Sequence, residues 1–156
     1  MHYTPMPRKL VYAILELLKL SDKDVLWDLG CGDGRILIAA ARIYGARAIG
    51  VEIRRWLTRI AIRNIRKFNL SDRVAIICGD FFRINLSSAT AITLYLSTKV
   101  NNVLKKKFVS ELKDGTRIIS LDFEIPGWPY NSLFKLNDGF KVHNAYLYVF
   151  KRSKYK

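Results

Sequence analysis

The stretch that decides the fold is VLWDLGCGDG, residues 25–34. Its first half, VLWDL, has the length and apolar character of a buried strand, and its glycines predict a tight turn. Apolar residues then recur at helical spacing from about Arg35 to Tyr44, and Gly45 suits a left-handed helix cap. A strand, a glycine-rich turn and a helix in this order open a β-α-β unit, which implies a parallel sheet.

The alternation of strand and helix continues on both sides of this unit. Helices are predicted at 8–20, 54–68 and 100–112, and strands at 46–51, 74–78, 91–96 and 117–122. The last part of the chain predicts a hairpin instead, with strands at 133–136 and 145–151 around the turn Asn137-Asp138-Gly139. We therefore expect an α/β protein with a doubly wound, mostly parallel seven-stranded sheet, helices on both faces and a C-terminal antiparallel hairpin. A chain of 156 residues suits one domain, residues 1–156.

The chain is strongly basic, with 27 lysines and arginines, 13 aspartates and glutamates, and a formal net charge of +14. Such a surface attracts polyanions, of which nucleic acid is the commonest in a cell. The alternative is the solvated surface of a thermophile's protein, which the complete absence of glutamine also fits. Contact with DNA or RNA is thus one of two open interpretations of the basic patches, which are Arg55, Arg59, Arg63 and Arg66 on one helix face, Lys105–Lys107, and Lys151–Lys154.

Several classes of protein are disfavoured by what the sequence lacks. Cys31 and Cys78 are far apart, so neither a disulfide framework nor a zinc site is indicated. His2 and His143 are the only histidines, which leaves little material for a histidine-based metal site or catalytic triad. No apolar stretch approaches the ~20 residues of a membrane span, and the N-terminus lacks a signal-peptide pattern. We expect a cytoplasmic protein with no membrane partner.

The first three strands are each followed by residues suited to a ligand, because ligands of such sheets lie beyond the carboxyl ends of the strands. Strand one leads into Asp28 and the glycine turn, strand two ends at Glu52, and strand three is followed by Gly79-Asp80-Phe81. Gly30 and Gly32 let the backbone approach a ligand closely. Glu52, about 20 residues after the turn, is expected to bind ribose hydroxyls. This much fits either a dinucleotide or an adenosyl cofactor.

The acids at the turn decide between the two cofactors. A pyrophosphate beside Asp28 and Asp33 would meet like charges, each contact costing roughly 3–4 kcal/mol at ~4–6 Å. S-adenosylmethionine has no phosphate, and its ammonium and sulfonium groups are cations that carboxylates attract. The sequence therefore favours S-adenosylmethionine over NAD. Asp80 then suits the adenine amine, with Ile53 and Phe81 packing against the faces of the ring.

These motifs resemble a known family. The sequences DLGCGDG at 28–34, GVEI at 50–53 and GDF at 79–81 are similar to the first three cofactor motifs of class I methyltransferases. Tyr3-Thr4-Pro5-Met6-Pro7 resembles the start of small archaeal protein-lysine methyltransferases, relatives of the non-SET histone-lysine enzymes, although Met6 stands where that family has threonine. This resemblance implies that residues 1–20 form a cofactor-covering segment and helix, with Tyr3 and Pro5 over the methionine end. The cofactor-binding residues then expected are Tyr3, Pro5, Asp28, Gly30, Gly32, Asp33, Glu52, Ile53, Gly79, Asp80 and Phe81.

The methyl acceptor is less constrained. The chain lacks the Asn/Asp-Pro-Pro-Tyr tetrapeptide that holds planar amino groups, and it has no cysteine beyond strand four for attack on cytosine carbon. Lysine side chains of proteins fit what remains, because an apolar, aromatic channel and a nearby sulfonium both lower the pKa of an amine. Tyr95 and Trp128 are the candidates for lining that channel. An RNA acceptor and a catalytically inactive binding module stay as alternatives, since a basic enzyme repels lysine-rich proteins.

Overall fold

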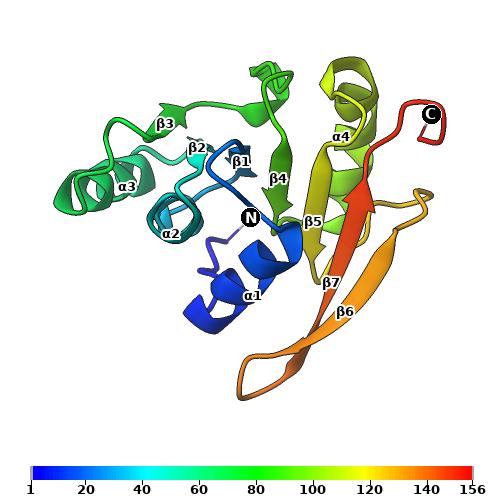
Figure 1. Ribbon diagram of the computed structural model, residues 1–156, viewed down its shortest axis with the longest axis horizontal. Helices are drawn as coiled ribbons and strands as arrows, with labels where there is room; N and C mark the ends of the chain where they lie inside the picture. The colour runs from blue at the N-terminus through cyan, green and yellow to red at the C-terminus, as the bar shows by residue number, and fades with distance from the viewer. Residues whose placement is uncertain (1, 156) are drawn as a thin grey trace.

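A single mixed sheet forms the centre of the molecule, in the strand order β3-β2-β1-β4-β5-β7-β6 (Figure 1). The computed structural model describes residues 2–155, so residues 1 and 156 of the predicted domain lie outside the described part. The first five strands pair in parallel, whereas β7 pairs antiparallel with both β5 and β6. This arrangement confirms the predicted seven-stranded α/β sheet with its C-terminal hairpin. The strands are β1 (Val25–Leu29), β2 (Arg47–Glu52), β3 (Val74–Cys78), β4 (Ala91–Leu94), β5 (Arg117–Leu121), β6 (Ser132–Asn137) and β7 (Val142–Val149).

Helices cover both faces of the sheet, as the crossover pattern predicted. The helices are α1 (Arg8–Leu18), α2 (Arg35–Tyr44), α3 (Arg55–Lys67) and α4 (Thr98–Glu111), with a short 3₁₀ turn at Phe81–Arg83. The apolar stripes of α1, α2 and α3 share one core with side chains such as Leu26 and Ile119 from the sheet. On the opposite face, α4 packs over a second core that contains Trp27, Ile118 and Tyr148. None of the helices described between residues 2 and 155 is long and apolar enough to cross a bilayer.

The ends of some elements differ from the prediction for local reasons. The strand β4 stops at Leu94 and α4 starts at Thr98, because the Ser97 hydroxyl caps the helix by accepting the Val100 N–H at 3.1 Å. The strand β7 begins at Val142, earlier than predicted, because the polar residues His143 and Asn144 interrupt the apolar pattern but still pair with β6. Helix α2 keeps the predicted bounds.

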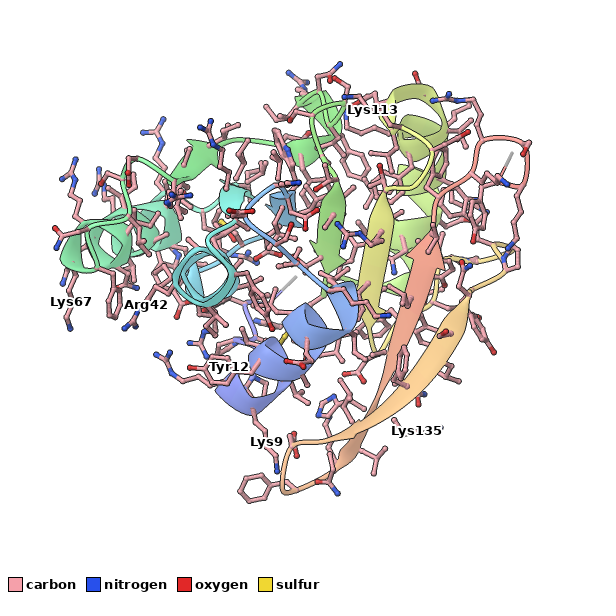
Figure 2. All side chains as sticks on the ribbon, in the orientation of Figure 1. Lys9, Tyr12, Arg42, Lys67, Lys113 and Lys135 are labelled. Atoms are coloured by element: carbon pink, nitrogen blue, oxygen red, sulfur yellow. The ribbon has the colours of Figure 1, made fainter. Side chains whose placement is uncertain are left out.

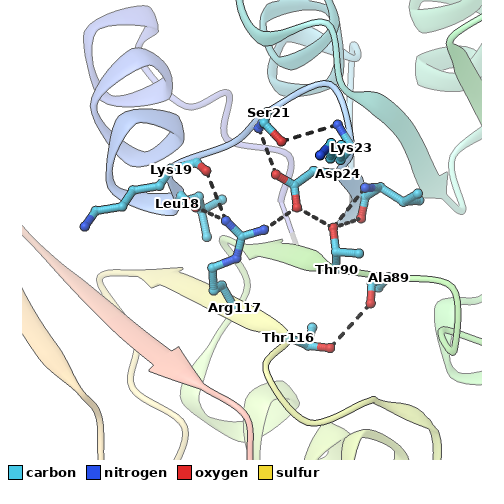
Figure 3. Close-up of polar contacts among 10 residues, drawn as sticks. Leu18, Lys19, Ser21, Lys23, Asp24, Ala89, Thr90, Thr116 and Arg117 are labelled. Atoms are coloured by element: carbon cyan, nitrogen blue, oxygen red, sulfur yellow. Dashed lines mark hydrogen bonds and ion pairs between the residues drawn. The ribbon is translucent and has the colours of Figure 1, made fainter.

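A network of polar side chains holds together the amino ends of three strands (Figure 3). The Arg117 guanidinium at the start of β5 forms an ion pair with Asp24, which precedes β1. Asp24 also accepts hydrogen bonds from the Ser21 N–H at 2.8 Å and the Thr90 hydroxyl at 2.7 Å, before β4. A further guanidinium hydrogen bond, to the Lys19 carbonyl at 3.1 Å, reaches the end of α1. The polar contacts at the amino ends of these strands therefore stabilise the fold. The predicted ligand residues lie at the opposite edge, where the carboxyl ends of the strands are.

Candidate cofactor and acceptor site

Two adjoining cavities lie at the carboxyl ends of β1, β2, β3 and β4. The smaller, about 80 Å³, lies under the N-terminal segment, and the larger, about 240 Å³, extends towards β3. They share Gly30, Glu52, Arg54 and Leu96, so together they form one cleft with two halves. All the predicted cofactor residues line this cleft: Tyr3, Pro5, Asp28, Gly32 and Asp33 the smaller half, Ile53, Gly79, Asp80 and Phe81 the larger, and Gly30 and Glu52 both. Arg54 and Leu96, which both halves share, were not among the predicted cofactor residues.

The glycine turn brings the backbone against the N-terminal segment. Gly32 has φ +57°, and a Cβ built on it would lie 2.6 Å from the Tyr3 ring. Tyr3 in turn lies edge-on to Trp56, with ring centroids 6.0 Å apart. The missing side chain at position 32 is therefore what lets Tyr3 lie over the turn and cover the smaller half of the cleft.

The variant Gly32→Ala is expected to weaken cofactor binding by about tenfold, equivalent to about 1.4 kcal/mol. The new methyl group would push Tyr3 off the turn and open the cover. Isothermal titration calorimetry measures the affinity. The matched control is Gly115→Ala, which also places a side chain at a positive φ, +93°, but has open space around its Cβ. In a Tyr3→Ala background the Gly32 substitution should have little further effect on affinity. An unchanged effect there would rule out the contact with Tyr3 as the cause.

Glu52 is buried at the junction of the two halves. Its side chain is 3% exposed, and its two oxygens accept the Gly32 N–H at 3.0 Å and the Arg54 N–H at 2.8 Å. The Arg54 guanidinium lies 3.5 Å from one of these oxygens. A carboxylate oxygen has lone pairs for more than one donor, so Glu52 remains able to accept hydroxyl hydrogens from a ligand.

Asp28 is a buried carboxyl group in the smaller half of the cleft. The Thr93 hydroxyl donates to its Oδ1 at 2.9 Å. Burial raises the pKa of Asp28 to about 7, the Thr93 hydrogen bond opposes this rise, and the negative charges of Glu52 and Asp33 add to it. A cation beside Asp28 would lower that pKa, because it stabilises the carboxylate. The site therefore has an electrostatic preference for a positively charged ligand group.

Asp33 lines the same half, but its carboxylate forms an ion pair with Arg35, which was not among the predicted site residues. The Arg35 guanidinium approaches the Asp33 carboxylate at 2.6 Å, and the pKa of Asp33 is lowered because this pairing outweighs its partial burial. Arg35 also donates to the Met6 carbonyl at 2.9 Å. Asp33 therefore contributes less free negative charge than predicted, and the Asp33–Arg35 pair fastens the N-terminal segment to the turn.

The larger half of the cleft is mainly apolar. Ile53 and Phe81, the two side chains predicted to pack against the adenine ring, both line it. Asp80 lines it too, and one carboxylate oxygen caps the following 3₁₀ turn by accepting the Phe82 N–H at 2.9 Å. Asp80 can cap the turn and still accept a hydrogen bond from adenine, as predicted. Its second carboxylate oxygen lies 4.0 Å from the exposed Arg83 side chain and is accessible to a ligand.

The two residues predicted for the acceptor channel lie in different places. Tyr95 lines the smaller half of the cleft, beside Asp28 and Tyr3. Trp128 does not line it. Its side chain is 6% exposed and packs in the core under α4, with ring centroids 4.6 Å from Tyr155 and 5.9 Å from Phe150. The prediction for Trp128 is therefore corrected: its ring does not line a channel but fills the second core.

A buried histidine between two aspartates lies near Tyr95 and was missed by the sequence analysis. His143 on β7 is 2% exposed, and its ring nitrogens lie 2.8 Å from Asp122, which follows β5, and 2.8 Å from Asp138 in the hairpin turn. Burial raises the pKa of the Tyr95 hydroxyl, and the charges of Asp122 and Asp138 raise it further. The cluster thus gives the side of the cleft at Tyr95 a negative field.

The cluster predicts a pH-dependent stability. Burial lowers the pKa of His143, but the bonds to Asp138 and Asp122 raise it more, so the net pKa is above the ordinary value of 6.5. Because the folded pKa exceeds the unfolded one, the charged histidine stabilises the fold below pH 6.5, and this contribution disappears as the pH rises through the folded pKa. At pH 5.5 we expect His143→Gln to lower the free energy of unfolding by about 1–2 kcal/mol, because the charged hydrogen bond to Asp122 is lost.

Urea unfolding at pH 5.5 and pH 9 measures this effect. The difference between the wild type and His143→Gln should shrink at pH 9. An equal difference at both pH values would show that His143 is not charged in the folded protein.

The cleft as a whole fits a nucleoside that ends in a cation. The apolar half accepts a flat base, Glu52 at the junction accepts hydroxyl hydrogens, and Asp28 favours positive charge in the other half. A pyrophosphate in the smaller half would lie next to both buried carboxylates and be repelled by them. The residues present therefore suit S-adenosylmethionine better than a dinucleotide.

Comparison with known proteins agrees with this chemistry. A family model described as the ANTKMT methyltransferase domain matches residues 28–132, which include the glycine turn, Glu52, Asp80 and Tyr95. The chain is 46% identical over 148 residues to a protein-lysine N-methyltransferase of Saccharolobus islandicus, covering 94% of this chain and 92% of that protein.

Two further relatives widen the comparison. The adenine nucleotide translocase lysine N-methyltransferase of Mus musculus is 32% identical over 101 residues, which cover 65% of this chain and 44% of that protein. Among solved structures, an RNA methyltransferase from Salinibacter ruber in complex with S-adenosyl-L-homocysteine superimposes with a TM-score of 0.89. It is 38% identical, and the match covers 94% of this chain and 93% of that one.

Proposed function

This chain belongs to the ANTKMT methyltransferase domain family of class I S-adenosylmethionine-dependent enzymes, and from that membership we propose that it methylates lysine side chains of proteins. The observation that carries the proposal is the 46% identity to a protein-lysine N-methyltransferase over 94% of the chain. The two-part cleft independently supports the cofactor part of the proposal, because its buried carboxylates and apolar half suit S-adenosylmethionine.

Each part of the cofactor has residues to hold it. The adenine ring would lie between Ile53 and Phe81 with its amine towards Asp80, and Glu52 would accept hydrogen bonds from the ribose. Asp28 would accept from the ammonium of the methionine part, with Tyr3 and Pro5 covering that end. When bound, S-adenosylmethionine would supply a methyl group on a positively charged sulfur: a neutral amine would bond to the methyl carbon in line, and the sulfur would leave as a neutral thioether. The protein's contribution is then mainly to position the two reactants.

The surroundings of Tyr95 favour a lysine over a neutral acceptor. Tyr95 lies at the methionine half of the cleft, and Asp122 and Asp138 are near enough to raise its pKa. Their field attracts an ammonium group locally, on a protein whose overall charge of +14 would repel it. We propose that Tyr95 lines the channel in which the lysine loses its proton, where the positive charge of the bound sulfonium would favour the neutral amine.

RNA is the second candidate acceptor, because the similar structure from Salinibacter ruber is described as an RNA methyltransferase. The basic patches predicted from the sequence are consistent with it, since Arg55, Arg59, Arg63 and Arg66 are all exposed along α3. A cytoplasmic location and a thermophilic origin remain predictions from the sequence.

Labelling with radioactive S-adenosylmethionine in a cell extract separates the two acceptors. With the wild type we expect label in protein that survives RNase and appears as methyllysine after acid hydrolysis. Label that disappears with RNase, and migrates with nucleosides after nuclease digestion, would overturn the lysine proposal in favour of RNA. No label in any fraction, with the cofactor still bound in calorimetry, would indicate the binding module. The Glu52→Ala variant serves as the cofactor-deficient control.

A further inference from the structure

A groove outside the cofactor cleft lies between α1, α2 and α3. This groove, about 460 Å³, is lined by residues of all three helices and of the turn before α2. Figure 2 shows Tyr12, Arg42 and Lys67 projecting from α1, α2 and α3 on the same side of the molecule, and all three line the groove. It borders the cleft, because the Asp33–Arg35 pair lines both.

The groove is strongly basic. Arg8, Arg35, Arg42 and Lys67 line it, against a single carboxylate, that of Asp33, which Arg35 already neutralises. The ion pairs found among residues 2–155 do not include Arg8, Arg42 or Lys67. Concave surfaces lined by one sign of charge concentrate the opposite charge. The groove therefore attracts an anion or a chain of anions.

The groove also presents flat surfaces among its cations. Tyr12 is 50% exposed and Phe68 is 40% exposed, although both are large apolar rings on a charged surface. The Arg42 guanidinium lies 4.3 Å from the centre of the Phe68 ring. Aromatic rings and planar arginine groups interleaved with phosphate-binding cations are the features that bind unpaired bases along a single strand. A duplex, whose bases are stacked inside, would use the cations but not the rings.

We propose that the groove between α1, α2 and α3 is a binding site for single-stranded nucleic acid, with RNA as the natural chemical class. Arg8, Arg42 and Lys67 contact phosphates, and a base stacks on Tyr12. The site is separate from the methyl-transfer cleft, so a substrate protein that carries its own RNA would be held beside the cofactor. This inference does not depend on lysine being the acceptor.

Fluorescence anisotropy with a short labelled single-stranded RNA tests the proposal. We expect the affinity of the wild type to fall steeply between about 50 and 200 mM salt, as phosphate contacts require. Arg42→Glu/Lys67→Glu should reduce affinity by about tenfold or more and lower the salt slope by about 1.4, since each phosphate contact to a single strand contributes about 0.7. Tyr12→Ala should reduce affinity by about tenfold with the salt slope unchanged, because it removes stacking and no charge.

The matched control is Lys113→Glu/Lys135→Glu, which makes the same change in net charge at two exposed lysines, one after α4 and one on β6, that do not line the groove. It should change the affinity by no more than about threefold, through the general field alone. Equal losses in both double variants, or no binding of the RNA at about 50 mM salt, would overturn the proposal. Binding of polyglutamate or of duplex RNA as tightly as the single strand would also overturn it, in favour of a general polyanion surface.

Cofactor affinity, measured on the same variants by calorimetry, keeps this result separate from the proposed function. Arg42, Lys67 and Tyr12 lie outside the cofactor cleft, so S-adenosylmethionine should bind all variants equally. Circular dichroism on heating checks that each variant is folded.

Discussion

The Asp28→Asn variant is expected to be more stable than the wild type without cofactor, and yet to bind S-adenosylmethionine far more weakly. The pKa of Asp28 is raised from 3.8 to about 7, so its ionisation opposes folding. This penalty is absent below pH 3.8, grows as the pH rises, and is complete above about pH 7. At pH 8 we expect asparagine to raise the free energy of unfolding by about 2–4 kcal/mol, because raising a pKa by one pH unit corresponds to about 1.4 kcal/mol.

The affinity should change in the opposite direction. Asparagine keeps the shape of the side chain but loses the charge that attracts the cofactor's ammonium group, so binding should weaken by about 10–100-fold. For the wild type, affinity should also fall as the pH drops below about 7, because Asp28 becomes protonated. The variant lacks this dependence.

Two measurements check the prediction for Asp28. Urea unfolding at pH 5 and pH 8 should show a larger gain for the variant at pH 8, and calorimetry gives the affinity over the same range. A variant that is less stable at pH 8, or that binds the cofactor as tightly as the wild type, would falsify the role given to this carboxylate.

Glu52→Ala should lose both stability and cofactor binding. The carboxylate of Glu52 accepts the buried N–H groups of Gly32 and Arg54, so its removal leaves two donors without an acceptor. We expect a loss of about 2–4 kcal/mol in the free energy of unfolding. The affinity for S-adenosylmethionine should fall by about 100-fold, because the proposed ribose contact and the shape of the glycine turn are lost together.

Glu111→Ala is the matched control for Glu52. Glu111 also accepts a backbone N–H, that of Leu86 at 2.8 Å, and pairs with Lys107, but it lies outside the cleft. It should reduce stability without changing cofactor affinity. If Glu52→Ala were to bind the cofactor normally once its lower stability is allowed for, the ribose role would be wrong.

The fold and the cofactor half of the site were predictable from sequence because their signals are local. The glycine turn and Asp28 are contiguous, and Glu52 and Asp80 each follow a recognisable strand. Parallel strands end at one edge, so the fold brings these residues together. The charge of Asp33 was misjudged because the number of acids in the turn does not show that Arg35, two residues later, pairs with the Asp33 carboxylate.

The acceptor half was harder to predict because its residues meet only in three dimensions. Asp122, Asp138 and His143 come from the end of β5, a hairpin turn and β7, and no fixed spacing connects them. Trp128 shows the converse: its neighbours Gly127 and Pro129 are typical of a loop, yet its ring packs among four aromatic residues, Phe108, Tyr148, Phe150 and Tyr155. Packing of this kind is decided by the whole fold.

The division of the cleft among four separate strand ends has a thermodynamic consequence. Residues 3, 28, 52, 80 and 95 come together only when the crossover connections between the strands have folded. A partly folded chain therefore has no assembled site for the cofactor. Ligand that binds the native state alone raises its stability by mass action, by about 2.7 kcal/mol when the free concentration is 100 times Kd. A shift in melting temperature with added S-adenosylmethionine thus reports on assembly of the entire sheet, and cells rich in this metabolite would hold more of the protein in its native form.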